Sequence, residues 1–214
     1  MADCQSRFIE LFGDPNGNSY GWDIASLGEL FSVGSSKRIY QNEQVESGIP
    51  FLRISDLIQR IEEGVEVAEL YISEACYKEL KEKQLVPSPG DILVTSRGTL
   101  GKCYEIKECD EFYFQDGMIS WLYNRKPFVA NVYIMHLFKM PGFRKQIDEV
   151  PAGSTVNYLS LARLKELQIM CPPMELQEQF AAFVEQTDKS KLAVQQGLQE
   201  LEILKKSLMQ QYFG

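Results

Sequence analysis

The last forty residues of the chain carry its most regular hydrophobic pattern. Two series with a seven-residue spacing, offset by four residues, run along it: Phe180, Thr187, Val194, Leu201 and Leu208, and Val184, Lys191, Leu198, Lys205 and Tyr212. Such spacing is typical of the seam of a coiled coil. Because Pro172 and Pro173 favour a helix start just before the pattern, we predict one long helix over residues 171–214.

This helix would be roughly 60 Å long at 1.5 Å per residue. Helices in globular proteins average about 11–12 residues, so a long core helix is the weaker interpretation. An apolar stripe left in water is a large patch that monomeric proteins avoid. We therefore expect two copies to pair as an antiparallel homodimer through a stripe formed by Phe180, Val184, Val194, Leu198, Leu201, Leu208 and Tyr212.

The rest of the chain mixes short helical and strand patterns without a regular alternation. Helices are expected over residues 5–12, 75–80, 128–140 and 159–167, with Ser73 capping the second. Strands are expected over residues 24–27, 50–54, 65–71, 92–94, 104–106, 112–114, 118–123 and 167–170. The pattern predicts an α+β protein: a short N-terminal helical region (1–20), one globular domain with a mixed twisted sheet (21–170), and the long C-terminal helix (171–214).

Composition narrows the class of protein. The 214 residues contain no apolar run long enough to span a membrane and no secretory signal pattern, so a cytoplasmic location is the simplest expectation. Five cysteines without a Cys-x-x-Cys pair, and His136 as the only histidine, argue against a zinc site. We expect no metal in the chain and reduced, structural thiols.

The formal net charge of −8 is unusual for a protein that binds DNA by itself. The charge is unevenly distributed, because residues 56–79 are rich in glutamate whereas residues 117–147 contain basic residues and no acidic ones. One face of the domain can therefore meet phosphates while another repels them. DNA affinity depends on the number of neutralised phosphates, so basic partner proteins are expected.

The beginning of the chain resembles its end. Residues 6–13 and 207–214 share a serine, an apolar residue, a phenylalanine and a final glycine at matching positions. This short match indicates that the chain is one unit of a tandem repeat, which starts in the tail of one long helix and ends with the next.

Four segments resemble the specificity subunits of type I restriction–modification enzymes, in a half-length form. They are residues 8–15 with Gly21-Trp22 and 27–30, residues 49–56, residues 153–157, and the Pro-Pro-Met-Glu-Leu-Gln-Glu-Gln start of the long helix. In that family a target recognition domain alternates with a long helix, twice in a full subunit and once here. The resemblance implies a non-catalytic subunit without a cofactor that binds double-stranded DNA. Its implied partners are methyltransferase subunits, which use S-adenosylmethionine on adenine, and a separate restriction (motor) subunit.

Several polar positions are candidates for contact with DNA. Residues 96–102 form a basic, glycine-rich stretch after a buried strand, in which Arg97 can pair with guanine or grip a phosphate. Gln115 can read adenine or simply lie in a turn, and the polar residues before the 159–167 helix can donate to phosphates or cap that helix. The full set is Lys37, Arg38, Arg53, Ser96, Arg97, Thr99, Lys102, Gln115, Ser154, Thr155 and Asn157.

Catalytic interpretations are weaker. Asp91, Glu105 and Lys107 resemble a metal-dependent nuclease motif, but this loose pattern also fits a solvated strand face. We therefore predict a DNA recognition subunit that directs methyltransferase and restriction subunits to a two-part target. The alternatives are a coiled-coil adaptor or decoy that binds no DNA, and a stand-alone nuclease.

Overall fold

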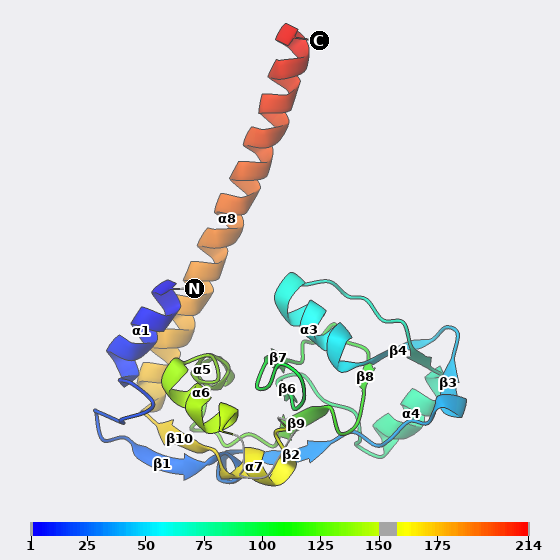
Figure 1. Cartoon of the computed structure of the whole chain (residues 1–214), viewed down its shortest axis with the longest axis vertical. Helices are drawn as coiled ribbons and strands as arrows, with labels where there is room; N and C mark the ends of the chain where they lie inside the picture. Colours follow the sequence, from blue (N-terminus) through cyan, green and yellow to red (C-terminus); the bar gives the residue numbers. More distant parts are fainter. Residues whose placement is uncertain (1, 150–157, 214) are drawn as a thin grey trace.

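A computed structural model describes residues 2–149 and 158–213 and has two parts, a globular domain and a long helix that projects from it (Figure 1). The helices are α1 (Ala2–Phe12), α2 (Leu27–Leu30), α3 (Ile54–Glu63), α4 (Glu74–Glu82), α5 (Asn131–Leu137), α6 (Pro141–Asp148), α7 (Leu161–Glu166) and α8 (Met174–Phe213), with a 3-10 turn at Gln41–Glu43. The strands are β1 (Asp23–Ser26), β2 (Ser32–Ser35), β3 (Gln44–Val45), β4 (Ile49–Leu52), β5 (Tyr71–Ile72), β6 (Ile92–Thr95), β7 (Cys103–Glu105), β8 (Tyr113–Phe114), β9 (Ile119–Tyr123) and β10 (Gln168–Cys171).

The strands form two small sheets and a separate ladder. One sheet has the antiparallel order β2-β9-β6-β7, and its central strand β6 is buried throughout, as expected for an unbroken apolar run. The second sheet has the order β3-β5-β4-β8 and contains one parallel pair, β4 with β8. The ladder pairs β1 with β10, so the start and the end of the domain lie side by side before α8 begins. The predicted α+β class with a long C-terminal helix is confirmed.

The largest hydrophobic cluster joins both chain ends to the domain. Phe8 and Phe12 of α1 are fully buried, and their rings contact Phe180 of α8 at centroid distances of 5.4 and 5.5 Å. Tyr133 of α5 stacks on Phe8 at 5.4 Å. The short helix α1 therefore covers the base of α8 (Figure 1). Helix α8 could not bury these aromatic residues by itself.

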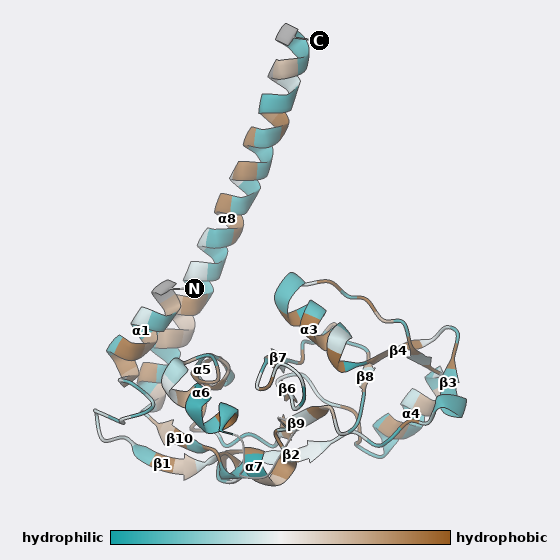
Figure 2. Cartoon of the chain, viewed as in Figure 1, coloured by the Kyte–Doolittle hydropathy of each residue, from teal (hydrophilic) through white to brown (hydrophobic). Residues whose placement is uncertain are grey.

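This packing corrects two of the residues predicted for a dimer interface. Phe180 is fully buried and Val184 nearly so, both inside the cluster that α1 shares with α5 and α8. The seven-residue pattern begins at these positions, but the chain's own first helix covers them. Further along, Val194, Leu198 and Leu201 are exposed, and Leu208 and Tyr212 belong to α8 with side chains outside the described part. Figure 2 shows the apolar positions that recur along the projecting helix.

Other local predictions differ from the structure in instructive ways. Helix α3 was missed, although Asp56 accepts a hydrogen bond from the Arg53 backbone at its start and Gly64 ends it with a φ of 68°. The strand predicted over residues 65–71 is wrong except for Tyr71, because no neighbouring strand pairs with the rest. The helix predicted over residues 128–140 is the shorter α5, and a second helix, α6, follows it with Pro141 in its first turn.

Three local predictions are confirmed. Ser73 caps α4 by accepting a hydrogen bond from Cys76 N at 3.1 Å, β10 lies at the edge of its ladder, and α8 starts directly after the two prolines. Each of these rests on a signal that is complete within a few residues of sequence.

Candidate nucleic-acid interface

Strand register brings most of the candidate residues to one end of the β2-β9-β6-β7 sheet. Ser35, at the end of β2, pairs with Ser120, and Thr95, at the end of β6, pairs with Ile119 at the start of β9. The segments that follow β2 and β6 and the one that precedes β9 therefore leave the sheet on the same side. These segments contain Lys37, Arg38, Arg97, Thr99 and Gln115. We call this side the loop end of the sheet.

The loop between β6 and β7, residues 96–102, is fixed by hydrogen bonds to Thr95 at its start. Thr95 is fully buried, and its hydroxyl donates to the Thr99 carbonyl and accepts from Lys102 N at 3.0 Å. Gly101 has a φ of 71°, and a Cβ there would meet Ile147 of α6 at 3.0 Å, so glycine is needed for this close approach. The loop is thus a fixed turn whose outer residues 97–99 are exposed.

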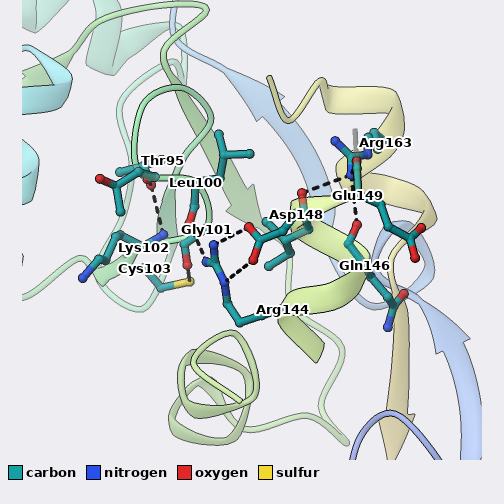
Figure 3. A network of polar contacts seen from close by, with 12 residues as sticks. Thr95, Leu100, Gly101, Lys102, Cys103, Arg144, Gln146, Asp148, Glu149 and Arg163 are labelled. Atoms are coloured by element: carbon teal, nitrogen blue, oxygen red, sulfur yellow. Dashed lines mark hydrogen bonds and ion pairs between the residues drawn. The ribbon is translucent and has the colours of Figure 1, made fainter. Parts of the chain in front are cut away.

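Helix α6 supports this loop through Arg144 (Figure 3). Its guanidinium donates from Nη1 to the Leu100 carbonyl at 2.6 Å and forms two bonds to the Asp148 carboxylate, at 2.6 and 3.2 Å. At the C-terminus of α6, Arg163 of α7 donates to the carbonyls of Gln146 and Ile147 at 3.1 and 3.0 Å, and also to that of Glu149. A cation at a helix C-terminus satisfies carbonyls that have no partner within the helix.

The segment after residues 150–157 returns to the same loop. Leu159 N donates to the Ser96 carbonyl at 3.0 Å, and Arg97 pairs with Tyr158 in an isolated antiparallel bridge. The Arg97 guanidinium lies 4.9 Å from the centroid of the Tyr158 ring. Both ends of the 150–157 segment, Glu149 and Tyr158, are therefore attached to the elements that hold the 96–102 loop.

Arg97 is well suited to meet an anion. It is exposed, and the described residues show it stacked on an aromatic ring and not paired with a carboxylate. A guanidinium stacked in this way keeps its donors free while its orientation is restricted. Sequence reasoning found Arg97 but missed Tyr158, Arg144 and Arg163. Their partners lie 14 to 61 residues away along the chain, and only an aromatic beside a polar loop hinted at Tyr158.

Ser96 does not belong to the accessible surface, which corrects one predicted contact. Its side chain is buried and its hydroxyl lies 2.6 Å from that of Ser120. Two buried hydroxyl groups that satisfy each other stabilise the crossing of β6 and β9. Ser96 directly follows β6 and stays buried because its N–H donates to the Met118 carbonyl and its carbonyl accepts from Leu159 N.

The other basic candidates are paired with acids; Arg38 and Lys102 belong to segments at the loop end, whereas Arg53 follows β4 of the second sheet. Arg38 contacts Asp116 at 3.0 Å and Lys102 contacts Glu62 at 2.8 Å. Arg53 contacts both Asp56 and Glu69, at 3.1 and 2.9 Å. Exposed pairs of this kind are weak, so a phosphate can compete for Arg38 and Lys102. Arg53 also orders the start of α3 and is the least available of the three.

Lys37 and Gln115 complete the loop end. The Lys37 side chain is exposed, and its backbone N–H donates to the Tyr113 hydroxyl at 2.7 Å. Burial raises the pKa of Tyr113 to about 12, so this hydroxyl stays neutral near physiological pH. Gln115 N donates to the Leu52 carbonyl at 2.9 Å, which fixes its backbone. Ser154, Thr155 and Asn157 lie outside the described residues.

The residues of the nuclease hypothesis have structural partners. Asp91 accepts from Trp121 Nε1 at 2.9 Å and from Ser88 N at 2.8 Å, and burial raises the pKa of its carboxyl. Glu105 accepts from Asn131 at 2.7 Å. Within residues 2–149 and 158–213, no group of three or more histidine, cysteine or acidic side chains is arranged to hold a metal ion. The same ranges contain no helix that is long and apolar enough to cross a membrane.

A mixed α/β domain that ends in a long projecting helix is a fold with known relatives. The chain is similar to a subunit in a structure of a type I restriction–modification system, studied for its assembly and conformational transition, with a TM-score of 0.63 and 19% identity. It is also similar to the HsdS subunit from Thermoanaerobacter tengcongensis, with a TM-score of 0.61 and 16% identity. The matches cover 97% and 99% of this chain but 48% and 50% of those chains.

Sequence comparison extends this likeness from fold to family. A protein from Haemophilus influenzae named as a type I restriction enzyme specificity subunit is 29% identical over 176 residues, which are 82% of this chain and 42% of the relative. The family described as the type I restriction modification DNA specificity domain matches residues 20–203. The chain belongs to this family, and it spans about half the length of the relatives it matches. The predicted family and its non-catalytic class are thereby confirmed.

Proposed function

We propose that this chain recognises one half of a two-part DNA target and directs methyltransferase and restriction subunits to it. The observation that carries this proposal is the convergence of Arg97, Thr99, Lys37, Arg38 and Gln115 at one end of one sheet. Direct base readout needs side chains of several kinds on a rigid support. The loop end offers guanidinium, ammonium, amide and hydroxyl groups. Its 96–102 loop is fixed by α6 and by Tyr158, and the backbones of Lys37 and Gln115 are fixed by bonds to Tyr113 and Leu52.

The proposal also accounts for the acidic composition. With a net charge of −8, the chain gains little from non-specific attraction to DNA. Methyltransferase subunits would supply the missing positive charge, and S-adenosylmethionine would be bound by them and not by this chain. Binding to DNA is therefore expected only from the assembled complex.

A second copy of the chain, paired through α8, would recognise the other half of the target. The exposed apolar residues of that helix support self-association, and a closed two-fold pair is the commonest solution for identical chains. An antiparallel pair would carry the two domains at opposite ends, so the two half-sites would be separated by a fixed gap. The target would then read the same on both strands.

The test compares Arg97→Ala with Lys126→Ala in the complex with the methyltransferase partner. Lys126 is an exposed cation that follows β9 at the opposite end of the same sheet, so it is a charge-matched control. Loss of a guanine contact at Arg97 should weaken target binding by about 1–3 kcal/mol and relax one base position. Loss of a phosphate contact should weaken all sequences alike and lower the salt dependence.

Lys126→Ala should leave both the affinity and the base preference unchanged. If Arg97→Ala also binds every DNA as tightly as the parent at matched salt, the loop is only a turn and the proposed surface is wrong. The adaptor hypothesis predicts that no partner confers DNA binding. The nuclease hypothesis predicts magnesium-dependent nicking by the pure chain that Asp91→Ala abolishes.

A further inference from the structure

Arg38 and Lys102 are both paired with acids at the loop end, but the two pairs differ in which member lies outside. The Arg38 side chain is 64% exposed, whereas that of its partner Asp116 is 22% exposed. In the other pair the acid is the more exposed member, since Glu62 is 49% exposed and Lys102 is 37% exposed. A molecule that approaches Arg38 therefore meets the guanidinium first, and the carboxylate lies behind it.

The contact between Arg38 and Asp116 occupies only one side of the guanidinium. The Nε–H group of Arg38 donates to Oδ2 of Asp116 at 3.0 Å. Within residues 2–149 and 158–213, the two terminal nitrogens of this guanidinium have no polar partner. Because the N–H donors of a guanidinium lie in one plane, the edge formed by Nη1 and Nη2 stays available. That edge can donate to two acceptors of one partner at the same time.

The backbone that carries Arg38 is fixed on both sides of the residue. Before it, the N–H group of Lys37 donates to the hydroxyl of the fully buried Tyr113 at 2.7 Å. After it, Ile39 is buried in the hydrophobic cluster that contains Tyr113. Arg38 therefore points outward from a segment that is anchored at each neighbouring position.

Asp116 lies on a turn that is fixed in the same way. Gln115 N donates to the Leu52 carbonyl at 2.9 Å, and Gly117 N donates to the Ser35 hydroxyl at 3.3 Å. Gly117 has a φ of 68°, which glycine adopts without strain. Since Ser35 ends β2, this turn is attached to the strand that leads into the basic member of the pair. The carboxylate is thus a rigid support for the guanidinium.

We propose that Arg38 reads a guanine base of the target and that Asp116 is the positioning residue that orients it. This inference rests on the proposed function and names the base that one residue of the recognition surface selects. Guanine presents the acceptors O6 and N7 at its major-groove edge, and the planar pair of terminal donors matches them. Because Nε is already held, an exposed arginine loses less side-chain freedom when it binds. A phosphate is the poorer partner here, because the nearby carboxylate repels it.

The competing interpretation is that Asp116 only neutralises Arg38 until a phosphate takes its place. The two interpretations predict effects of opposite sign for Asp116→Ala. Removing a competing negative charge would strengthen binding to every DNA sequence and increase the salt dependence, because one more phosphate is neutralised. Removing a positioning residue would weaken the preference for one base pair and would not strengthen binding.

The test uses the complex of the full chain with its methyltransferase partner. Methylome sequencing with the parent chain gives the target motif. Duplexes that carry every base pair in turn at each motif position are then compared by competition binding at low and at physiological salt. The variants are Arg38→Ala, Asp116→Ala, Asp116→Asn and Lys37→Ala, and melting curves check that each one folds. Asp116→Asn keeps an oxygen that accepts from Nε–H, and Lys37 is the neighbouring exposed cation, so its loss matches the change in charge.

Arg38→Ala should reduce the preference for a G·C pair at one motif position by roughly 5- to 150-fold, which is the discrimination that a bidentate contact supplies. Asp116→Ala should relax the same position by about three-fold or more without tighter binding to other sequences. Asp116→Asn should retain most of the preference, and Lys37→Ala should leave the preference at this position intact.

The inference is overturned if Asp116→Ala binds all sequences more tightly with an unchanged motif, or if Arg38→Ala leaves every motif position intact. Equal relaxation of the position by Lys37→Ala also overturns it, because a loss of charge would then explain the effect. In each of these cases the parent chain still determines a motif, so the proposed function stands. A parent complex that produces no motif would overturn the proposed function and this inference with it.

Discussion

Helix α1 should be an integral part of the hydrophobic core, and Phe8→Ala tests this directly. The Phe8 ring is fully buried and contacts three other rings, those of Phe12, Tyr133 and Phe180, at centroid distances of 4.8 to 5.4 Å. Removing a buried phenylalanine from such a cluster typically costs about 3–5 kcal/mol, since the transfer free energy is lost and a cavity remains. The aromatic pair geometry adds to this loss.

A free-energy change of this size has a clear thermal signature. In a protein of 150–250 residues, 1 kcal/mol shifts Tm by roughly 2–4 °C, so Phe8→Ala should lower Tm by about 6–20 °C. The matched control is Ile9→Ala on the outer side of α1, where the side chain is 47% exposed. Its cost should stay below about 1 kcal/mol. Circular dichroism and calorimetric melting of the three proteins provide the comparison.

Equal Tm values for Phe8→Ala and Ile9→Ala would refute the packing argument. They would mean that α1 is not docked on α8 in solution and that the first turns of the apolar stripe are open. A selective effect of Phe8→Ala supports both the core and the covered base of α8.

Three further outcomes are expected. Leu198→Lys combined with Leu201→Lys should make the chain monomeric in sedimentation velocity, because four buried leucines per dimer become charged; an unchanged dimer would contradict the interface. Tyr158→Leu should weaken target binding by the assembled complex about two- to five-fold, whereas Tyr158→Phe keeps the ring and should bind like the parent. Asp110→Ala should destabilise the domain by about 3–5 kcal/mol in urea titration, because Arg60 would remain largely buried without its 2.8 Å partner; a loss below 1 kcal/mol would show that water replaces the pair.

The long helix was predictable because its signal is local and repeated. Two prolines, a first turn with Glu175 and a seven-residue pattern over forty residues all favour the same structure. The same pattern could not show which part of the stripe is covered. That depends on Phe8 and Phe12, which lie some 170 residues earlier and reach Phe180 only through the fold.

The sequence predicted which residue types form the candidate interface better than it predicted which of those residues are exposed. Arg97 stood out because a basic, glycine-rich turn follows a buried strand, and the structure has it exposed. Ser96 occupies the adjacent position and is buried, because its hydroxyl is bonded to that of Ser120 on β9. The support from Arg144 and Arg163 could not be read from sequence, because their bonds go to backbone carbonyls, which every residue carries.

The central claim is that this chain determines which DNA sequence its methyltransferase partner methylates. Its most direct test is methylome sequencing of a host that expresses the chain with its methyltransferase partner, alongside hosts that express the partner alone or with the Arg97→Ala variant. We expect the parent chain to produce methylated adenine in a single two-part motif that reads the same on both strands. Arg97→Ala should relax the motif at one symmetric position or reduce methylation throughout, and the partner alone should produce no motif. The account is contradicted if the partner alone methylates the same motif, or if adding this chain produces none.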